Sequence, residues 1–314
     1  MEQGKALQGK AIVITGSGRG IGAATAKYIA SIGARVVVND IDAEPARETA
    51  AAITGSGGEA VAHVGDIADW DVAGALIALC CERFGTIDGL VNNAGLFELG
   101  RIDELDRNSA RRIVDTNIIG TVNCAAHAVK PMLAQGSGSI VNISSGAHMG
   151  LPAMGMYGAT KGAVASLTYS WALDLAGTGI RVNAISPMAE TRMVDVSDKY
   201  RARHGIPPNP PVHAPPEYNS PAIAYLLSDE SSRLNGQMVR IEADQLAVVA
   251  HPAVILPTLQ RDGGWDLEAI RKAFAETLDG NVAPVGITAV EIARYAPPSG
   301  FWEQEGAQAG NSAE

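Results

Sequence analysis

Cysteine is scarce in this sequence. Cys80, Cys81 and Cys124 are its only cysteines. Their spacing does not match that of metal ligands, and an odd number does not suit a disulfide framework. We therefore expect reduced, buried thiols and a reducing compartment. The histidines show no ligand spacing either, so no metal is expected; they are His63, His127, His148, His204, His213 and His251.

Basic residues are also few relative to acidic ones, 24 against 34, and the formal net charge is −10. Nucleic acids and anionic membranes repel such a surface, so we expect neither as a partner. No apolar run approaches the length that crosses a bilayer, and Met1–Lys5 lead into a strand-like segment without a signal-peptide core. The sequence therefore predicts a cytoplasmic protein that acts on small molecules.

Short β-rich apolar runs alternate with helical patterns up to about residue 241. This alternation is typical of βαβ units and a parallel sheet, and the buried character of the runs indicates helices on both faces. We predict an α/β fold with a doubly wound, parallel, seven-stranded Rossmann sheet in one domain, residues 1–242. The expected strands are Ala11–Thr15, Arg35–Asn39, Ala60–Val64, Gly89–Asn92, Ser139–Ile143, Arg181–Ile185 and Gln237–Ile241.

Two later regions break this rhythm. The six prolines from Pro207 to Pro216 predict an irregular, fairly stiff loop. Residues 243–314 form a C-terminal extension, in which we expect an apolar segment at Leu246–Val249 and an amphipathic helix near Asp266–Leu278. The end of the extension, rich in Gly, Ala, Gln and Ser, is expected to be disordered.

A glycine-rich segment, Thr15–Gly22, follows the first expected strand and opens the first helix. Glycines allow a tight turn there and bring backbone N–H groups close to a pyrophosphate at a positive helix end. A glycine cluster alone is weak evidence, but this position, with an acid after the second strand, indicates a dinucleotide site. The spacing differs from GxGxxG and resembles the TGxxxGIG turn of the short-chain dehydrogenase/reductase family. The cofactor-binding residues expected in the turn are Gly16, Ser17, Arg19, Gly20, Ile21 and Gly22.

The second expected strand ends at Asp40. In a dinucleotide fold a carboxylate at this point accepts hydrogen bonds from the adenosine ribose and repels a 2′-phosphate. Asp40 therefore predicts NAD as the cofactor, the alternative being an ordinary exposed aspartate in a turn. Arg19 is a nearby cation that would tolerate a phosphate, but we expect it to be too solvated to reverse the preference.

Tyr157 and Lys161 lie four residues apart at the start of a helical pattern, so both side chains project from one face. An ammonium near a phenol favours the phenolate and moves its pKa from about 10 towards neutral, where acid/base catalysis is efficient. Alone, such a pair is commonly a solvated helix face. Downstream of the glycine turn it predicts Tyr157 as the group that exchanges the substrate proton.

The family resemblance extends over some 240 residues and implies further roles. It implies that Ser145 orients the substrate oxygen, with Ser144 as the competing assignment, and that Asn117 supports a water-mediated proton relay through Lys161. Lys161 would also bind the nicotinamide ribose. The other implied cofactor contacts are Asp66, Ile67, Asn93, Ala94, Gly95, Pro187 and Thr191.

The segment after the sixth expected strand departs from the family pattern. It reads Ser186-Pro187-Met188-Ala189-Glu190-Thr191, without the usual glycine after the proline and one residue shorter. Thr191 can still be aligned with the threonine that the family places against the nicotinamide carboxamide, in a loop that differs from the family pattern.

We expect an NAD-dependent oxidoreductase that interconverts a secondary alcohol and a ketone. The alternative is a catalytically inactive dinucleotide-binding relative, against which the intact Ser145, Tyr157 and Lys161 speak. An apolar rim predicts a cyclic or bulky substrate; its expected members are Leu151, Met154, Met156, Met193 and Val194. The resemblance implies a homodimer or homotetramer, for which we expect a self-complementary apolar face with Leu167, Trp171 and Leu175.

Overall fold

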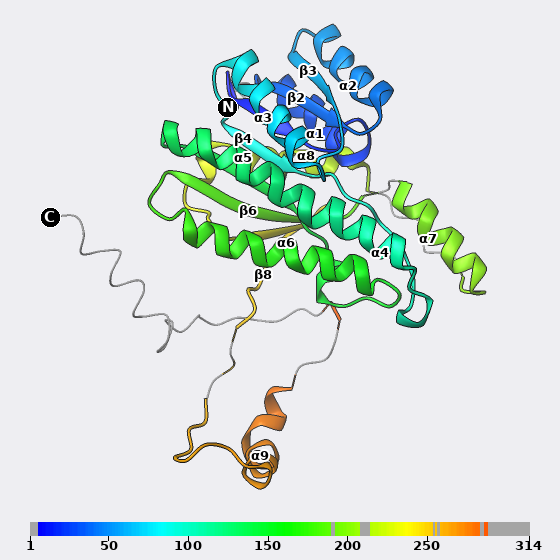
Figure 1. The fold of residues 1–314 in the computed structure, drawn as a ribbon, viewed down its shortest axis with the longest axis vertical. Coiled ribbons are helices and arrows are strands. Elements are labelled where there is room, and N and C mark those ends of the chain that lie inside the picture. The colour runs from blue at the N-terminus through cyan, green and yellow to red at the C-terminus, as the bar shows by residue number, and fades with distance from the viewer. Residues whose placement is uncertain are drawn as a thin grey trace, which may run out of the picture.

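The computed structural model describes residues 6–189, 192–207, 214–253, 255, 258–282 and 286–287. An eight-stranded sheet runs through it in the order β3-β2-β1-β4-β5-β6-β7-β8 (Figure 1). The first seven strands are parallel, which confirms the doubly wound fold. The strands are β1 Ala11–Ile14, β2 Arg35–Asp40, β3 Glu59–Val64, β4 Gly89–Asn92, β5 Gly138–Ile143, β6 Ile180–Pro187, β7 Met238–Glu242 and β8 Gln245–Val249.

The eighth strand corrects the predicted count of seven. β8 pairs with β7 in antiparallel register, from Glu242 opposite Gln245 to Met238 opposite Val249. Ala243 has a positive φ of 51° in the tight turn between the two strands. The apolar segment expected in the extension is thus the last strand of the sheet.

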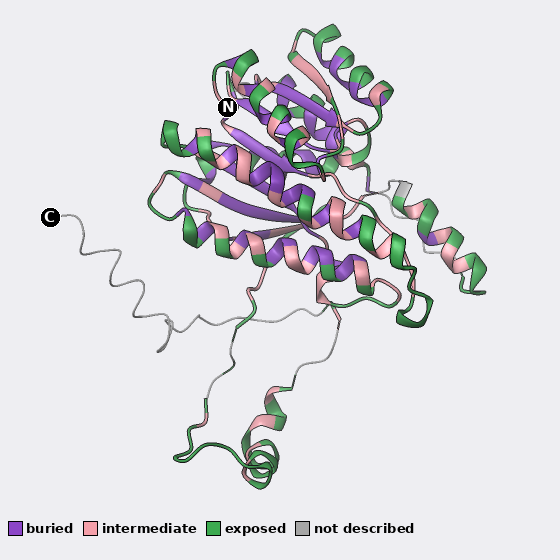
Figure 2. Ribbon diagram, viewed as in Figure 1, coloured by how far each residue is buried: buried purple, intermediate pink, exposed green. Residues whose placement is uncertain are grey.

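Helices cover both faces of the sheet, as the buried character of the strands predicted. One buried cluster joins β1 to α1, α2 and α8, and a second joins β1 to α3, α5 and α6. Ile12 and Ile14 belong to the first cluster and Ala11 and Val13 to the second, because successive side chains of a strand point to opposite faces. Figure 2 shows the resulting buried centre. The helices are α1 Gly20–Ser31, α2 Ala43–Gly55, α3 Trp70–Phe84, α4 Arg107–Val114, α5 Gly120–Gln135, α6 Gly155–Asp174, α7 Arg192–Arg203, α8 Ser220–Leu227 and α9 Leu267–Ala273.

The cysteines are free thiols, as expected. Burial raises the pKa of Cys80 and of Cys124 to about 12, so neither is a nucleophile at neutral pH. Cys81 is partly exposed, contrary to the expectation that all three are buried.

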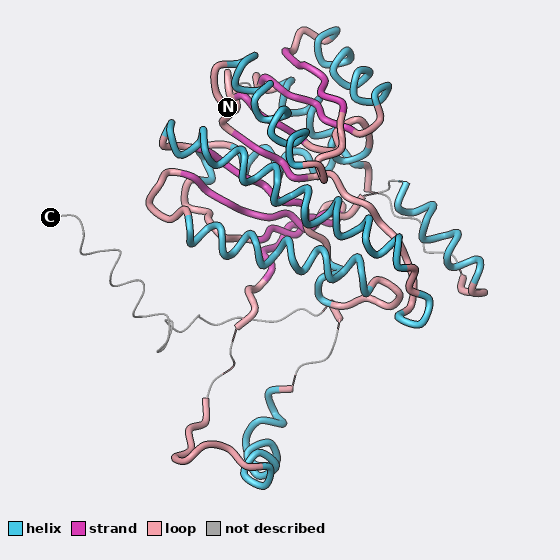
Figure 3. The backbone as a smooth tube through the Cα atoms, in the orientation of Figure 1, coloured by secondary structure: helices cyan, strands magenta, loops and turns pink. Residues whose placement is uncertain are grey.

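The helix expected near Asp266–Leu278 is present as α9, continued by a π-helical turn at Phe274–Leu278 (Figure 3). Asp266 caps it by accepting a hydrogen bond from the N–H of Ala269 at 2.8 Å. No residue of either segment is buried, and α9 stands away from the body of the protein. The final, Gly/Ala-rich part of the extension lies outside the described residues, as do residues 208–213 of the proline-rich loop.

The apolar face expected for self-association is partly wrong. Leu175 is buried, and Trp171 packs against the same core cluster of its own chain. Both side chains turn inwards because α6 covers one face of the sheet. Leu167 is partly buried, whereas Leu173 is exposed. Within the described residues, no helix is both long and apolar enough to cross a membrane.

Candidate active site

The glycine turn lies where the strand order reverses, between β1 and β4, which is the usual place for a ligand in a doubly wound sheet. Gly16 and Gly20 have positive φ values of 59° and 55°. A Cβ on Gly16 would lie 2.7 Å from Cα of Ala94, and one on Gly22 would lie 2.5 Å from Nδ2 of Asn93. The turn and the segment after β4 therefore touch through backbone, which only glycine permits at these positions.

Two hydroxyl groups hold this turn in place. Thr15 Oγ1 accepts hydrogen bonds from the N–H groups of Asn93 and Ala94, both at 3.0 Å. Ser17 is buried and donates from Oγ to the carbonyl of Ile14 at 2.7 Å. The sequence had indicated Ser17 as a cofactor contact, but its side chain is used within the turn. It had not singled out Thr15, whose position directly after a strand was the available signal.

Asp40 points back to the glycine turn. Its Oδ2 accepts a hydrogen bond from the N–H of Gly18 at 3.0 Å, and its Oδ1 accepts one from the N–H of Asp42 at 3.1 Å. Arg19 does not contact Asp40 but forms an ion pair with Asp42, with Nη1 and Oδ2 2.7 Å apart. The nearby guanidinium is therefore already paired with an acid. Ile21, the apolar residue of the turn, packs against the core.

The segment after β3 is fixed to α5. Ile67 is buried, and a Cβ on Gly120 would lie 2.8 Å from its Cδ1. Asn123 donates from Nδ2 to the carbonyl of Ile67 at 3.1 Å. Asp66 accepts a hydrogen bond from the N–H of Ala68 at 2.9 Å. Both residues predicted to lie beside the adenine thus lie in a loop that the neighbouring helix holds.

Tyr157 and Lys161 are brought together on the buried face of α6, as their spacing predicted. Lys161 Nζ lies 5.8 Å from the centre of the Tyr157 ring and donates a hydrogen bond to the carbonyl of Ile143 at 2.7 Å. Ser145 follows β5, and its side chain lies close enough to Tyr157 to lower the pKa of the phenol. Ser145 Oγ also accepts the N–H of Ala147 at 3.2 Å, which leaves its own hydrogen free to be donated.

Ser144, the competing assignment, points elsewhere. Its buried Oγ donates to the backbone carbonyl of Lys161 at 2.9 Å. The hydroxyl of Ser144 therefore joins β5 to α6, whereas that of Ser145 lies close to the phenol.

The pKa of Tyr157 is shifted in the direction opposite to the expected one. Burial raises the pKa of Tyr157, and the nearby Ser145 side chain offsets this only in part. Burial lowers the pKa of Lys161 to about 8. The expected lowering of the phenol pKa is thus not found, because desolvation acts on both groups and the ammonium is engaged by a backbone carbonyl.

Asn117 lies in a π-helical turn, Asp115–Ile119, between α4 and α5. Its Oδ1 accepts the N–H of Leu96 at 2.7 Å, and its Nδ2 donates to Thr160 Oγ1 at 3.0 Å. A Cβ on Gly95 would lie 3.4 Å from Oδ1 of Asn117 and 3.5 Å from Nζ of Lys161. Asn117 therefore joins the loop after β4 to the helix that carries Tyr157 and Lys161.

Apolar side chains surround the Tyr157 ring. Phe97 packs edge-on against it, with ring centres 4.9 Å apart, and Met154 and Met156 belong to the same cluster. Of the expected rim, these two methionines are at the site; Leu151 and Met193 are exposed. Phe97 was not predicted from the sequence as a site residue, although it lies just after the Asn93-Ala94-Gly95 motif.

Comparison with known proteins gives the family. Residues 10–201 match the family described as short chain dehydrogenase. The chain belongs to the short-chain dehydrogenase/reductase family. The cis-4-hydroxycyclohexanecarboxylate dehydrogenase of Sinomonas cyclohexanicum is 39% identical over 254 residues, which are 78% of this chain and 100% of the relative. Members of this family are oxidoreductases that act on CH–OH groups with a nicotinamide dinucleotide.

Two solved structures resemble this chain. An NAD+-bound xylitol dehydrogenase has a TM-score of 0.69 at 28% identity, covering 76% of this chain and 100% of that one. A gluconate 5-dehydrogenase from Burkholderia cenocepacia J2315, in complex with NADP and tartrate, has a TM-score of 0.68 at 32% identity, covering 77% and 98%. Both NAD and NADP thus occur among the chain's structural neighbours.

The carboxyl end of β6 is anchored without the glycine that the family usually has. Pro187 is the last residue of the strand, and the N–H of Met188 donates to the carbonyl of Ile241 at 3.0 Å. Buried Asn219 donates to the carbonyl of Met188 at 3.2 Å. Thr191 lies outside the described residues.

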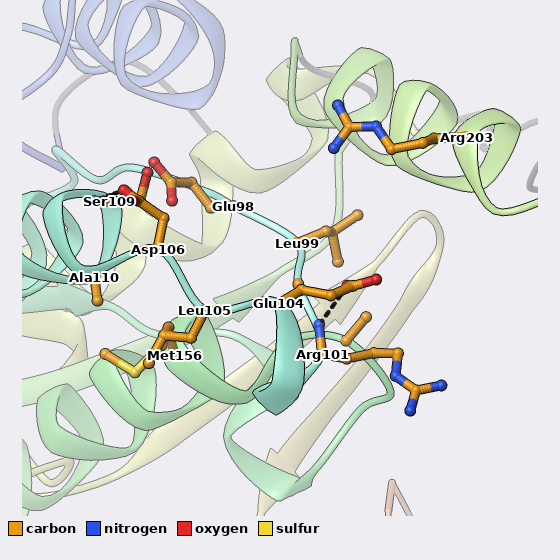
Figure 4. A pocket seen from close by; sticks show the side chains of 12 residues that line it. Glu98, Leu99, Arg101, Glu104, Leu105, Asp106, Ser109, Ala110, Met156 and Arg203 are labelled. Carbon is orange, nitrogen blue, oxygen red and sulfur yellow. Dashed lines mark hydrogen bonds between the residues drawn. The ribbon is translucent and has the colours of Figure 1, made fainter.

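A cleft opens between α4, the start of α6, the loop after β4 and the end of α7; Tyr157 does not line it, but Met156, which packs in the same cluster as Tyr157, does. Its lining includes Leu99, Leu105, Met156 and Arg203 (Figure 4). No group of three or more His, Cys, Asp or Glu side chains in the described part of the chain is arranged to hold a metal ion.

Proposed function

We propose that this protein is an NAD-dependent dehydrogenase that interconverts a secondary alcohol and a ketone. The observation that carries the proposal is the Tyr157 phenol, buried against apolar side chains and close to the Ser145 side chain, with Lys161 one helical turn further. A phenol placed in this way can exchange the proton of an alcohol or carbonyl oxygen.

Each residue of the group has a distinct proposed role. In alcohol oxidation Tyr157 accepts the hydroxyl proton of the substrate as the C–H bond at the same carbon breaks. In ketone reduction Tyr157 donates a proton to the carbonyl oxygen. Ser145 donates a hydrogen bond to the same oxygen and stabilises the charge that develops there. Lys161 supplies positive charge beneath the phenol and binds the nicotinamide ribose, and Asn117 holds the elements that carry them. When bound, the nicotinamide accepts or supplies the hydride.

The residues after β1 fit a dinucleotide. The glycine turn leads directly into α1, whose first N–H groups have no helical partner and attract a pyrophosphate. A Cβ on Gly18 would lie 2.7 Å from Oδ2 of Asp40, so the glycine keeps open the space beside the carboxylate. Asp40 would then bind the ribose hydroxyls of the adenosine half.

NAD is the proposed cofactor because of the charges around Asp40. A 2′-phosphate would face this carboxylate, and the local cation, Arg19, is paired with Asp42. The solved neighbours do not decide the choice, since one holds NAD+ and another NADP.

The proposed substrate is apolar and cyclic or bulky. Phe97, Met154 and Met156 surround the phenol, and flexible methionines adapt to irregular apolar shapes. The name of the Sinomonas relative describes a substituted cyclohexanol as its substrate, which favours a ring alcohol here. We further propose a cytoplasmic homo-oligomer.

A substrate screen tests the proposal. Purified protein is mixed with NAD and a panel of cyclic, terpenoid, steroid, acyl and sugar alcohols, and absorbance of the reduced cofactor is followed. We expect turnover of ring or bulky apolar alcohols. A strong preference for sugars or small open-chain charged hydroxy acids contradicts the proposed substrate class, and no turnover of any alcohol contradicts the proposed function.

A further inference from the structure

Two segments far apart in the chain meet at Glu104: the loop after β4 and α7. Glu104 ends a short 3-10 turn, Ile102–Glu104, in the loop after β4. Its Oε2 accepts hydrogen bonds from the N–H of Arg101 at 2.9 Å and from the Tyr200 hydroxyl at 3.1 Å. Its Oε1 lies 3.3 Å from His204 Nε2. Tyr200 belongs to α7, and His204 follows that helix directly.

The second link runs from the same loop to α6. The N–H of Gly100 donates to the carbonyl of Ala153 at 2.8 Å, and Gly100 and Met154 form an isolated parallel bridge. Met154 packs in the cluster around Tyr157. The loop after β4 is therefore fixed to the catalytic helix at one point and to α7 at another.

The polar contacts of Glu104 add to the support that α7 has from buried Ser197. None of its described residues belongs to a buried apolar cluster, and Met193 and Val196 are exposed. The rings of Tyr200 and His204 stack with centres 4.3 Å apart, so the two groups that bind Glu104 also support one another. Without an apolar interface, a helix is held in place by such local contacts.

α7 lies at the edge of the sheet where the proposed active site is. α7 follows β6, whose carboxyl end lies at the edge of the sheet where the glycine turn and Tyr157 also lie. The cleft has Arg203 of α7 on one side, Glu104 on the loop after β4, and Met156 of α6 on another (Figure 4). A shift of α7 would therefore change the width of this cleft.

We propose that Glu104 is a positioning residue that holds α7 beside the cleft lined by Met156 and thereby shapes the space through which the alcohol reaches the phenol. The assignment of the cleft to substrate rests on the proposed function. The hold on α7 does not, because it follows from the contacts of Glu104 alone. Glu104 itself does not touch the reacting atoms.

Hydrogen exchange and kinetics test this role together. In Glu104→Ala we expect the amides of α7 to exchange about tenfold faster and the KM for the alcohol to rise about tenfold, the effect of losing one charge-assisted hydrogen bond at a half-exposed site. Affinity for NAD should not change. Glu104→Gln should restore most of the wild-type behaviour, since the amide oxygen can still accept from Tyr200 and Arg101.

The neighbouring acid gives a matched control. Asp103 lies on the same turn and pairs with Arg101 at 3.0 Å, without a contact to α7 in the described residues. Asp103→Ala removes the same charge and should leave both measurements at wild-type values. Tyr200→Phe should match Glu104→Ala in direction, and the double variant should be no worse than Glu104→Ala alone.

The outcomes separate this inference from the proposed function. Unchanged α7 exchange in Glu104→Ala, or an equal change in Asp103→Ala, overturns the hold on α7. Faster exchange with an unchanged KM overturns the role of α7 at the substrate cleft. If the wild-type protein oxidises no alcohol, the proposed function fails, while the exchange measurement still decides whether Glu104 holds α7.

Discussion

The carboxylate of Asp40, at the end of β2, accepts a hydrogen bond from the backbone N–H of Gly18 in the turn after β1. The acid that faces the adenosine ribose in the proposed complex is thus fixed by the turn proposed to hold the pyrophosphate. The same turn carries Arg19, whose guanidinium faces Asp42 instead. The electrostatics of this corner favour a cofactor without a 2′-phosphate.

The first prediction concerns this corner. A 2′-phosphate adds about two negative charges beside Asp40, and we expect NAD to be preferred over NADP by roughly a hundredfold in kcat/KM. Asp40→Ala should narrow the gap by removing both the ribose contacts and the repulsion. Kinetics with the two cofactors check this, and equal or better use of NADP by the wild-type protein would show that Arg19 dominates.

The second prediction concerns the phenol. Tyr157→Phe keeps the ring that packs against Phe97, so the fold should be retained. Turnover should fall by at least ~100-fold, as is typical when a general acid/base is lost, while NAD still binds. Near-normal turnover would refute the assignment. Turnover is measured at saturating cofactor, and cofactor binding is measured separately by fluorescence titration.

The third prediction separates the two serines after β5. Ser145→Ala should lower kcat/KM by ~100-fold, because a donor to the substrate oxygen is lost. Ser144→Ala should leave kcat/KM within a few-fold and instead lower the free energy of unfolding by about 1 kcal/mol, since a buried hydrogen bond to the Lys161 carbonyl is lost. The opposite order of effects on kcat/KM would return the assignment to Ser144.

The fourth prediction concerns pH and stability. The pKa of Lys161 is about 8 in the folded protein, below its ordinary value of 10.5. Between these values the unfolded chain binds a proton that the folded protein does not, so Lys161 makes the free energy of unfolding rise with pH over this window, by up to about 3 kcal/mol. Lys161→Met removes this contribution. Urea unfolding of both proteins measures the free energy of unfolding of the wild-type protein minus that of Lys161→Met. This value should become more positive from pH 8 to pH 10; a constant value would mean that the lysine pKa is not lowered.

The fifth prediction concerns the glycine turn. A Cβ on Gly22 would lie 2.5 Å from both Nδ2 of Asn93 and the carbonyl oxygen of Gly16. Gly22→Ala should therefore lower the free energy of unfolding by about 1–3 kcal/mol and weaken NAD binding. Gly55 ends α2 with open space around it and serves as the control, since Gly55→Ala should be neutral or slightly stabilising. Thermal unfolding with and without NAD would contradict this if the two variants behaved alike.

Much of the fold could be predicted because seven of the strands are short apolar runs bounded by glycine-containing turns. β8 was missed as a strand because its residues Gln245–Val248 are all exposed, so the sequence pattern that marks a half-buried strand is absent. Its pairing depends on a tight turn at Ala243, a residue type that does not indicate a positive φ.

The site shows the same division. The four-residue spacing of Tyr157 and Lys161 is a local property of a helix and could be predicted. The direction of the Tyr157 pKa shift could not be predicted, because it depends on tertiary burial and on the backbone carbonyl to which Lys161 Nζ donates a hydrogen bond. Glu104 and Tyr200 come from segments far apart in the chain, and no sequence pattern near either residue predicts their contact.

The extension approaches the loop after Ser145 at Gly146. A Cβ on Gly146 would lie 3.0 Å from Cδ1 of Ile287 and 2.7 Å from Nη1 of Arg240. β8, His251 and Ile287 contact the body of the protein, and α9 lies between His251 and Ile287 in the chain. The entropy of closing a loop changes only slowly with its length. The segment that carries α9 can therefore gain or lose residues at little thermodynamic cost while Ile287 stays in place. A side chain at position 146, in contrast, would displace the end of the Ile287 side chain.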